Sequence, residues 1–210
     1  MTIKELTREQ ALAVLNHIWD CYEDYGSSRV VHAIQYNGKN YAVKIVADKQ
    51  GRFQNRTEID LFKEHGDEKF LNPIRWVYKD LMIICDYVYP MDSDLVDYAY
   101  HGDIDSIMDY YGGGEVEEYE ELCGSVSYVV NSLTEYQGET VDNFQIGYND
   151  NGFGTGNKHI VAYDYGYTVG VSNSIQVGNV SRYIPNCWDE DDTDMNVYQL
   201  MEEFIMEEEE

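Results

Sequence analysis

The chain begins with a helical pattern of apolar residues. These residues recur three or four positions apart, at Leu12, Leu15, Ile18 and Trp19. Thr7 and Gln10 precede them at the spacing of a capping box, and Gly26 follows them. The pattern therefore predicts a helix over about residues 8–24.

Two further patterns predict a hairpin and a second helix. Residues 30–46, VVHAIQYNGKNYAVKIV, contain two β-rich runs around Asn37-Gly38, which is the strongest short hairpin pattern. The segment QNRTEIDLFKEHG predicts a helix over about residues 55–65 that ends at Gly66.

Residues 74–90, IRWVYKDLMIICDYVYP, predict two more strands. A tight turn is expected at Lys79-Asp80, and Pro90 is expected to end the second strand. Residues 1–90 are therefore predicted to form a β-rich lobe that also holds the two helices.

Helical patterns dominate after residue 90. Residues 93–111 predict one or two short helices, which the glycines at 112–114 interrupt. Residues 116–135 predict a long helix. The side chains expected to face inward from this helix are Leu122, Val126, Val129, Val130 and Leu133.

The rest of the chain predicts one hairpin and one more helix. FQIGY and HIVAYD are expected to be strands joined by a segment rich in turn residues. Residues 171–194 carry only weak patterns, and about 195–206 predict an acidic amphipathic helix. The fold class is therefore α+β and two-lobed, with a small, acidic, helix-rich second lobe over residues 91–210.

The net charge of −26 is distributed unevenly along the chain. Residues 1–80 contain 12 basic and 12 acidic residues, whereas residues 81–210 contain 28 acidic residues and only two basic ones, Lys158 and Arg182. Such an acidic surface repels nucleic acid, anionic membranes and free nucleotides, and it attracts basic partners. Solubility or adaptation to salt is the alternative explanation.

The compartment follows from the cysteines and the N-terminus. The four cysteines are scattered and form no Cys-x-x-Cys pair, which favours reduced thiols over disulfides or a zinc site. No apolar run has the length of a membrane span, and the N-terminal MTIKELTREQ lacks the apolar core of a secretory signal. We therefore expect a cytoplasmic protein.

Four residues stand in the order that phosphoryl transfer needs. "NYAVKIV" places Lys44 near the end of a strand, and Glu58 follows in the inserted helix. "VDNFQIG" places Asn143 just before a strand, and "AYDYG" places Asp164 where the next strand is expected to end. A lysine that binds phosphate, an acid that fixes it and two oxygen ligands for Mg²⁺ are what this chemistry requires.

This order resembles the protein-kinase-like fold, and more narrowly a divergent, phage-encoded or bacterial kinase-like family. "GSSRVVHAI" stands where the glycine-rich loop belongs, and "GRFQNRTEI" leads into the helix of Glu58. The resemblance covers about residues 22–168. It implies a truncated kinase-like fold with an antiparallel sheet and one inserted helix in the first lobe, and a helical second lobe with a β-hairpin.

The resemblance also implies ligands. ATP and Mg²⁺ would be the cofactors. The residues implied for nucleotide binding are Lys44, Glu58, Ser27 and Ser28, and those implied for the metal are Asn143 and Asp164.

Departures from the family pattern argue against an efficient kinase. Counting back from Asn143, the kinase catalytic Asp falls on Gly138 and the preceding His on Tyr136. Glu139 is adjacent and is the candidate for a displaced base. The glycine-rich loop keeps one glycine, Gly26, and only 46 residues follow Asp164.

Plain structural roles remain open for each of these residues. Lys44 could extend from a strand end into solvent, and Asn55 with Glu58 also fits an N-cap box. Asn143 and Asp164 could serve only to cap or bracket turns. Arg29 is expected to be a surface or loop-anchoring residue.

Three functions are consistent with this sequence. The first is a catalytically impaired kinase-like phage protein in the host cytoplasm that binds a basic, nucleic-acid-binding host protein and so acts in host takeover or anti-defence, with nucleic-acid mimicry as one form. Its partner-binding residues would include Asp92, Asp94, Asp97, Asp103 and Asp105. The second is an active ATP- and Mg²⁺-dependent protein kinase, and the third is an acidic structural protein with no nucleotide role.

Overall fold

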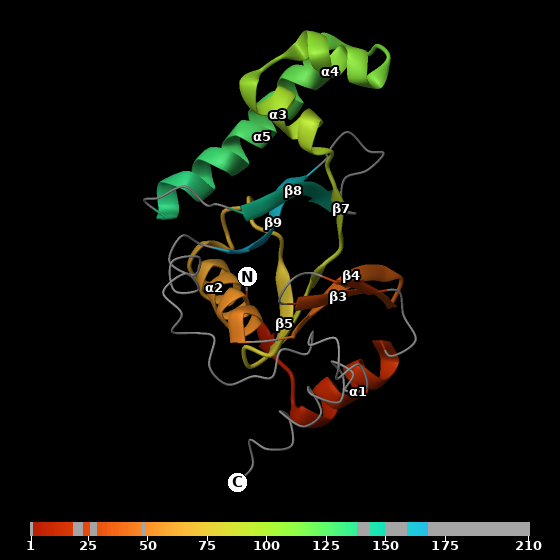
Figure 1. Ribbon diagram of the computed structural model, residues 1–210, viewed down its shortest axis with the longest axis vertical. Coiled ribbons are helices and arrows are strands. Elements are labelled where there is room, and N and C mark those ends of the chain that lie inside the picture. The colour runs from red at the N-terminus through yellow and green to blue at the C-terminus, as the bar shows by residue number, and fades with distance from the viewer. Residues whose placement is uncertain are drawn as a thin grey trace, which may run out of the picture. The chain divides into compact units, whose positions relative to one another are not determined.

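The computed structural model describes residues 2–18, 23–25, 29–47, 49–137, 143–149 and 159–167 (Figure 1). Within these ranges the chain is a mixed α+β protein with two β-sheets, as the sequence predicts at this level. The described residues belong to two compact units. Unit 1 draws them from residues 1–64 and 73–87, and unit 2 draws them from residues 65–72 and 88–169.

The larger sheet lies in unit 1 and has six described strands in the order β1-β5-β6-β4-β3-β2. β1 pairs parallel with β5, and the other neighbouring strands are antiparallel. The strands are β1 (Lys4–Glu5), β2 (Glu23–Tyr25), β3 (Arg29–Tyr36), β4 (Lys39–Val46), β5 (Ile74–Tyr78) and β6 (Met82–Asp86).

The predicted hairpin around Asn37-Gly38 is confirmed as β3 and β4. Both turn residues have positive φ, 50° and 73°, which matches the right-handed twist of the flanking strands. The two-residue turn sets Tyr36 opposite Lys39 and therefore Val31 opposite Lys44. Register in this part of the sheet is thus fixed by local sequence.

Two helices contact opposite faces of this sheet. α1 (Arg8–Ile18) buries Ala11, Leu15 and Ile18 in a cluster that includes Val43 and Ile45 of β4. Strand side chains alternate between faces, so Lys44 points to the other face. There it meets α2 (Lys49–His65).

The smaller sheet lies in unit 2 and has the order β7-β8-β9. Its strands are β7 (Val88–Pro90), β8 (Asn143–Asn149) and β9 (Ile160–Tyr167), all antiparallel to their neighbours. The chain between residues 65 and 72 also contributes, because Leu71 forms a parallel bridge with Ala162.

Three helices complete unit 2, and Figure 1 shows them together: α3 (Ser93–His101), α4 (Ile104–Tyr111) and α5 (Val116–Gln137). Val126, Val129 and Leu133 of α5 are fully buried, as the sequence predicts, while Leu122 and Val130 are partly buried. Full burial of one such side chain contributes about 1.5–3 kcal/mol.

The short helices have well-defined ends. Asp92 caps α3 by accepting a hydrogen bond from the Asp94 amide, and Asp103 caps α4 by accepting one from the Ser106 amide. Left-handed glycines follow each helix, at Gly102 and Gly112.

Several predicted boundaries are wrong. The first helix is described only to Ile18, and Glu23–Tyr25 form β2, because edge pairing with β3 overrides the helical pattern there. α2 begins at Lys49 rather than 55. The predicted strand ending at Pro90 is divided at Tyr87, with its second part in the other sheet.

Other predictions fall on segments that lie outside the described residues. These are residues 19–22 of the predicted first helix, the glycine loop at Gly26, Ser27 and Ser28, the catalytic-loop positions Gly138 and Glu139, the turn-rich segment joining β8 and β9, the weakly patterned residues 171–194 and the C-terminal helix at about 195–206.

Candidate functional site

Unit 1 holds a buried ion pair between Lys44 and Glu58. The Lys44 Nζ donates to both carboxylate oxygens of Glu58, at 3.0 and 2.9 Å. Lys44 is 4% exposed and Glu58 is 1% exposed. The structure therefore brings together the lysine and the acid that the kinase resemblance pairs, and the alternative in which Lys44 extends into solvent is wrong.

Arg29 joins this pair, contrary to the prediction that it lies at the surface or anchors a loop. Its Nη1 donates to Glu58 Oε1 at 2.6 Å and to Asn55 Oδ1 at 3.2 Å, and the residue is 5% exposed. The hairpin register explains its position, because Arg29 lies two residues before Val31, which is opposite Lys44 on the same face. We call Arg29, Lys44, Asn55 and Glu58 the buried polar cluster.

Asn55 does not cap a helix. It lies inside α2, is fully buried, and its Nδ2 donates to the backbone oxygen of Asp80 at 3.0 Å. Asp80 lies in the β5–β6 turn, where its carboxylate accepts hydrogen bonds from Arg52 and Arg56 of α2. The polar side of α2 therefore contacts the sheet at two places, the β5–β6 turn and the buried polar cluster.

The electrostatics of the cluster favour an ionised Glu58. Burial is the largest influence on the Glu58 pKa and would raise it, but the cations of Arg29 and Lys44 outweigh burial and hold that pKa below its ordinary value. Burial lowers the pKa of Lys44, and the attraction of Glu58 opposes this only in part. Repulsion from the Arg29 cation lowers the Lys44 pKa further. Among the described residues, both Arg29 and Lys44 donate to the carboxylate of Glu58, which links the two cations.

Cys85 lies on the same face of the larger sheet as Lys44, and its thiol is unreactive. Its partner across β4 is Ala42, two residues from Lys44. Burial raises the pKa of the Cys85 thiol to about 11, which outweighs the nearby Lys44 cation. A thiol with so little thiolate at neutral pH is a poor nucleophile, so this cysteine does not extend the cluster into a catalytic site.

The two residues implied for Mg²⁺ lie in unit 2, on adjacent strands. Asn143 is the first residue of β8 and is opposite Tyr167 of β9, while Gln145 is opposite Tyr163. Asp164 follows Tyr163 and therefore belongs to the same end of the ladder. It lies inside β9 rather than at the end of a strand, so the prediction that the strand ends there is wrong.

The positions of the other residues implied for nucleotide binding or catalysis are not described. Ser27, Ser28 and Glu139 lie outside the described residues. In the parts of the chain that the structure describes, no group of three or more His, Cys, Asp or Glu side chains is arranged to hold a metal ion.

Residues 92–121 of unit 2 form a continuous acidic segment, which we call the acidic surface. It contains no Lys or Arg, and all eleven of its carboxylate side chains are exposed. They belong to Asp92, Asp94, Asp97, Asp103, Asp105, Asp109, Glu115, Glu117, Glu118, Glu120 and Glu121. The five aspartates predicted to bind a partner are therefore all at the surface.

Aromatic side chains lie among these acids. Tyr100, Tyr110 and Tyr111 are 42–49% exposed, and the rings of Tyr110 and Tyr111 meet edge to face at 5.2 Å. Tyr111 also stacks on Tyr119, whose hydroxyl donates to the Gly113 oxygen at 2.6 Å. Exposed tyrosines held by such contacts are typical anchors of protein interfaces.

Two of the five aspartates also have structural roles. Asp92 and Asp103 are the helix caps described above, and hydrogen bonds from the Ser106 hydroxyl and amide lower the pKa of Asp103. Sequence reasoning missed these caps although Asp103 and Ser106 have capping spacing. Asp94, Asp97 and Asp105 remain as positions where charge can be changed without removing a cap.

The chain matches no protein-family model and no curated protein. Among the described helices, none is both long and apolar enough to cross a membrane.

Proposed function

We propose that this protein binds a basic protein partner through the acidic surface, and that it has a kinase-like scaffold of the divergent phage type with impaired phosphotransfer. The observation that carries the proposal is the exposure of all eleven carboxylates between residues 92 and 121, with no Lys or Arg among them. A patch of one sign attracts a partner of the opposite sign and steers its approach.

Charge placement supports binding over solubility. Residues 1–80 are neutral in sum, so the acids are concentrated rather than spread over the whole chain. The exposed tyrosines supply area that a soluble surface does not need. The partner's basic surface is proposed to be one that ordinarily binds nucleic acid, because spaced carboxylates can replace phosphates.

Reversing three charges on the acidic surface is expected to weaken partner binding roughly 10-fold or more. The variant is Asp94→Lys, Asp97→Lys and Asp105→Lys, which spares both caps. Binding is measured by capture of basic proteins from bacterial lysate at about 50 and about 500 mM salt, where screening separates electrostatic contacts from others.

A matched control carries the same change in charge elsewhere. It is Glu5→Lys, Glu9→Lys and Asp60→Lys, three exposed acids of unit 1. Equal loss of binding in both variants, or capture that ignores salt, would contradict a specific role for the acidic surface. The acidity would then serve solubility alone.

A second candidate function is ATP- and Mg²⁺-dependent phosphotransfer. The observation that favours it is the Lys44–Glu58 pair, which has the residue types and elements of the kinase pair. Two features favour the first proposal: the Lys44 side chain is buried against Glu58, and a glycine, Gly138, stands where the kinase pattern has its catalytic Asp. A missing group that orients the nucleophile costs on the order of 10²–10⁴ in rate.

Thermal unfolding with ATP and Mg²⁺ tests the second candidate. A ligand raises the midpoint only by binding the folded state, so an unchanged midpoint would contradict that candidate. A rise that disappears in Lys44→Met but persists in Lys39→Met, an exposed position of the same strand, would establish the nucleotide site that phosphotransfer requires.

A further inference from the structure

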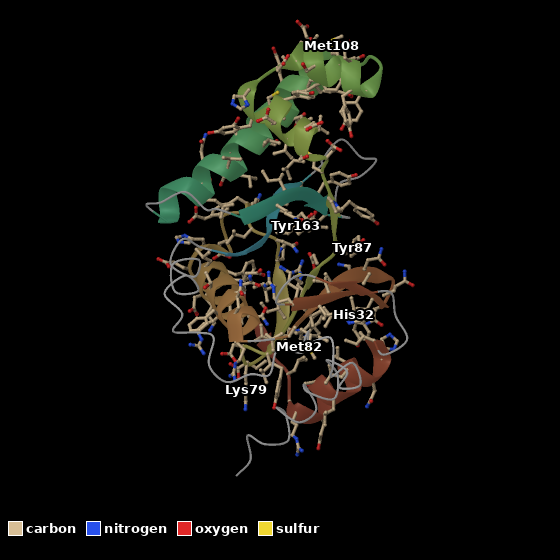
Figure 2. The ribbon with its side chains drawn as sticks, in the orientation of Figure 1. His32, Lys79, Met82, Tyr87, Met108 and Tyr163 are labelled. Carbon is tan, nitrogen blue, oxygen red and sulfur yellow. The ribbon has the colours of Figure 1, made fainter. Side chains whose placement is uncertain are left out.

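Unit 2 contains a pocket of about 460 Å³ beside the acidic surface. Helix α3 lines it with Val96, Asp97 and Tyr100, which share one face of the helix. The sheet contributes Ile146 of β8 and Tyr163 of β9, the latter labelled in Figure 2. The pocket falls within the size range of ligand-binding cavities.

The chemistry of the pocket suits one kind of side chain. Val96, Ile146 and the two tyrosine rings supply an apolar and aromatic lining, and Asp97 supplies a carboxylate whose side chain is 70% exposed. An arginine has an apolar stem and a planar cation that stacks on aromatic rings and binds a carboxylate through two parallel hydrogen bonds. Lysine shares the charge but neither the plane nor the paired donors.

The contact between the Asp97 carboxylate and its neighbour His101 is weak enough for a ligand cation to replace it. It lies 3.3 Å from the ring Nδ1 of His101, and both side chains are largely solvent-exposed. An exposed pair of this kind contributes little, so an incoming guanidinium can replace it. The polar groups of Ser93 and Gln145 also line the pocket and can bond the backbone next to an inserted side chain.

Continuity with the acidic surface favours a protein segment over a small cation. Asp97 and Tyr100 belong to both features, so a chain that enters the pocket continues over exposed carboxylates. An arginine side chain alone is smaller than 460 Å³, which leaves room for its neighbours in the segment.

We propose that this pocket receives an arginine side chain of the basic partner, with Asp97 binding the guanidinium and Tyr100 and Tyr163 enclosing it. This inference rests on the proposed function, and it identifies the pocket as the site that holds one arginine of the partner. The remaining carboxylates then provide attraction at a distance, and the pocket provides specificity for arginine.

The test uses the full chain and two labelled synthetic peptides. One contains five arginines separated by glycine and serine, and the other has lysine at the same five positions. Fluorescence anisotropy of the wild-type protein is expected to show tighter binding of the arginine peptide. Asp97→Asn should lower that affinity about 10-fold and reduce the preference for arginine.

Asp60→Asn is the matched control, since Asp60 is an exposed aspartate of α2 that belongs neither to the pocket nor to the acidic surface. It should change affinity less than about 2-fold, as expected of an exposed charge outside the contact. Equal effects of the two variants would overturn the pocket while leaving the acidic surface intact. Failure of both peptides to bind at low salt would overturn the proposed function itself. Spermidine that displaces the peptide from wild type but not from Asp97→Asn would assign the pocket to a small polyamine instead.

Discussion

Replacing Glu58 by glutamine is expected to lower the free energy of unfolding by about 3–5 kcal/mol. The substitution keeps the shape of the side chain and removes the carboxylate that accepts hydrogen bonds from Lys44 and Arg29. Two basic side chains would then remain buried without this carboxylate, and their mutual repulsion would add to the cost of burial. Chemical denaturation followed by circular dichroism measures the change.

Two further variants separate this mechanism from a general sensitivity of α2. Asp60→Asn removes an exposed acid from the same helix and should change stability by less than about 0.5 kcal/mol. The triple variant Arg29→Met, Lys44→Met and Glu58→Leu removes all charges together and should recover most of the loss. A loss below about 1 kcal/mol in Glu58→Gln would show that the cluster is not a coupled unit.

The effect of Glu58 also has a defined pH dependence. Its pKa is lowered in the folded state, so the unfolded chain takes up this proton at a higher pH than the folded chain does. The stabilisation is therefore fully present above the ordinary value of 4.5 and is lost as pH falls through the folded-state value. The difference in the free energy of unfolding between wild type and Glu58→Gln should therefore become smaller as the pH falls through this acidic range.

Gly147→Ala is expected to lower the free energy of unfolding by about 3 kcal/mol. A Cβ at this position would overlap the backbone oxygen of Tyr89 and a methyl of Val88 in the neighbouring strand β7. A backbone oxygen cannot turn away as a flexible side chain can, so the β7–β8 ladder must shift. Chemical denaturation again measures the effect.

Gly124→Ala is the matched control within the same unit. Gly124 lies in the interior of α5, and nothing lies within 4 Å of the Cβ that alanine would add. Alanine should therefore stabilise the protein by about 0.5–1 kcal/mol, by reducing the freedom of the unfolded chain. Two changes of the same sign would contradict the steric account of Gly147.

The hairpin shows how far local sequence can predict this fold. Asn37-Gly38 determines a two-residue turn, and counting back from it places Val31 opposite Lys44. The same counting puts Arg29 on the face of Lys44, so burial of the arginine near Glu58 could have been expected once register was considered. The prediction for Arg29 is wrong because the pattern Gly-Ser-Ser-Arg is typical of a loop, whereas Arg29 is the first residue of β3.

Other features depend on distant partners and have no local pattern. The segment from Met82 to Pro90 looks like one strand because its apolar residues are nearly continuous. It divides at Tyr87 because Val88 pairs with Asn149, which lies 61 residues later. Likewise α2 begins at Lys49, before the predicted start. Arg52 and Arg56 in its first part donate hydrogen bonds to Asp80 of the β5–β6 turn, and such a distant contact is not visible in a local helix-start pattern.

Pairing between distant segments also sets the order in which a growing chain can fold. All six described strands of the larger sheet have been synthesised once Asp86 is added, so that sheet can form early. Leu71 can pair only after Ala162 has been synthesised, and Val88 only after Asn149. At about 5–20 residues per second, synthesis of the intervening residues takes several seconds in each case. A nascent chain therefore carries β7 as an unpaired strand during this interval, and the acidic segment that follows it opposes association between neighbouring nascent chains through charge repulsion.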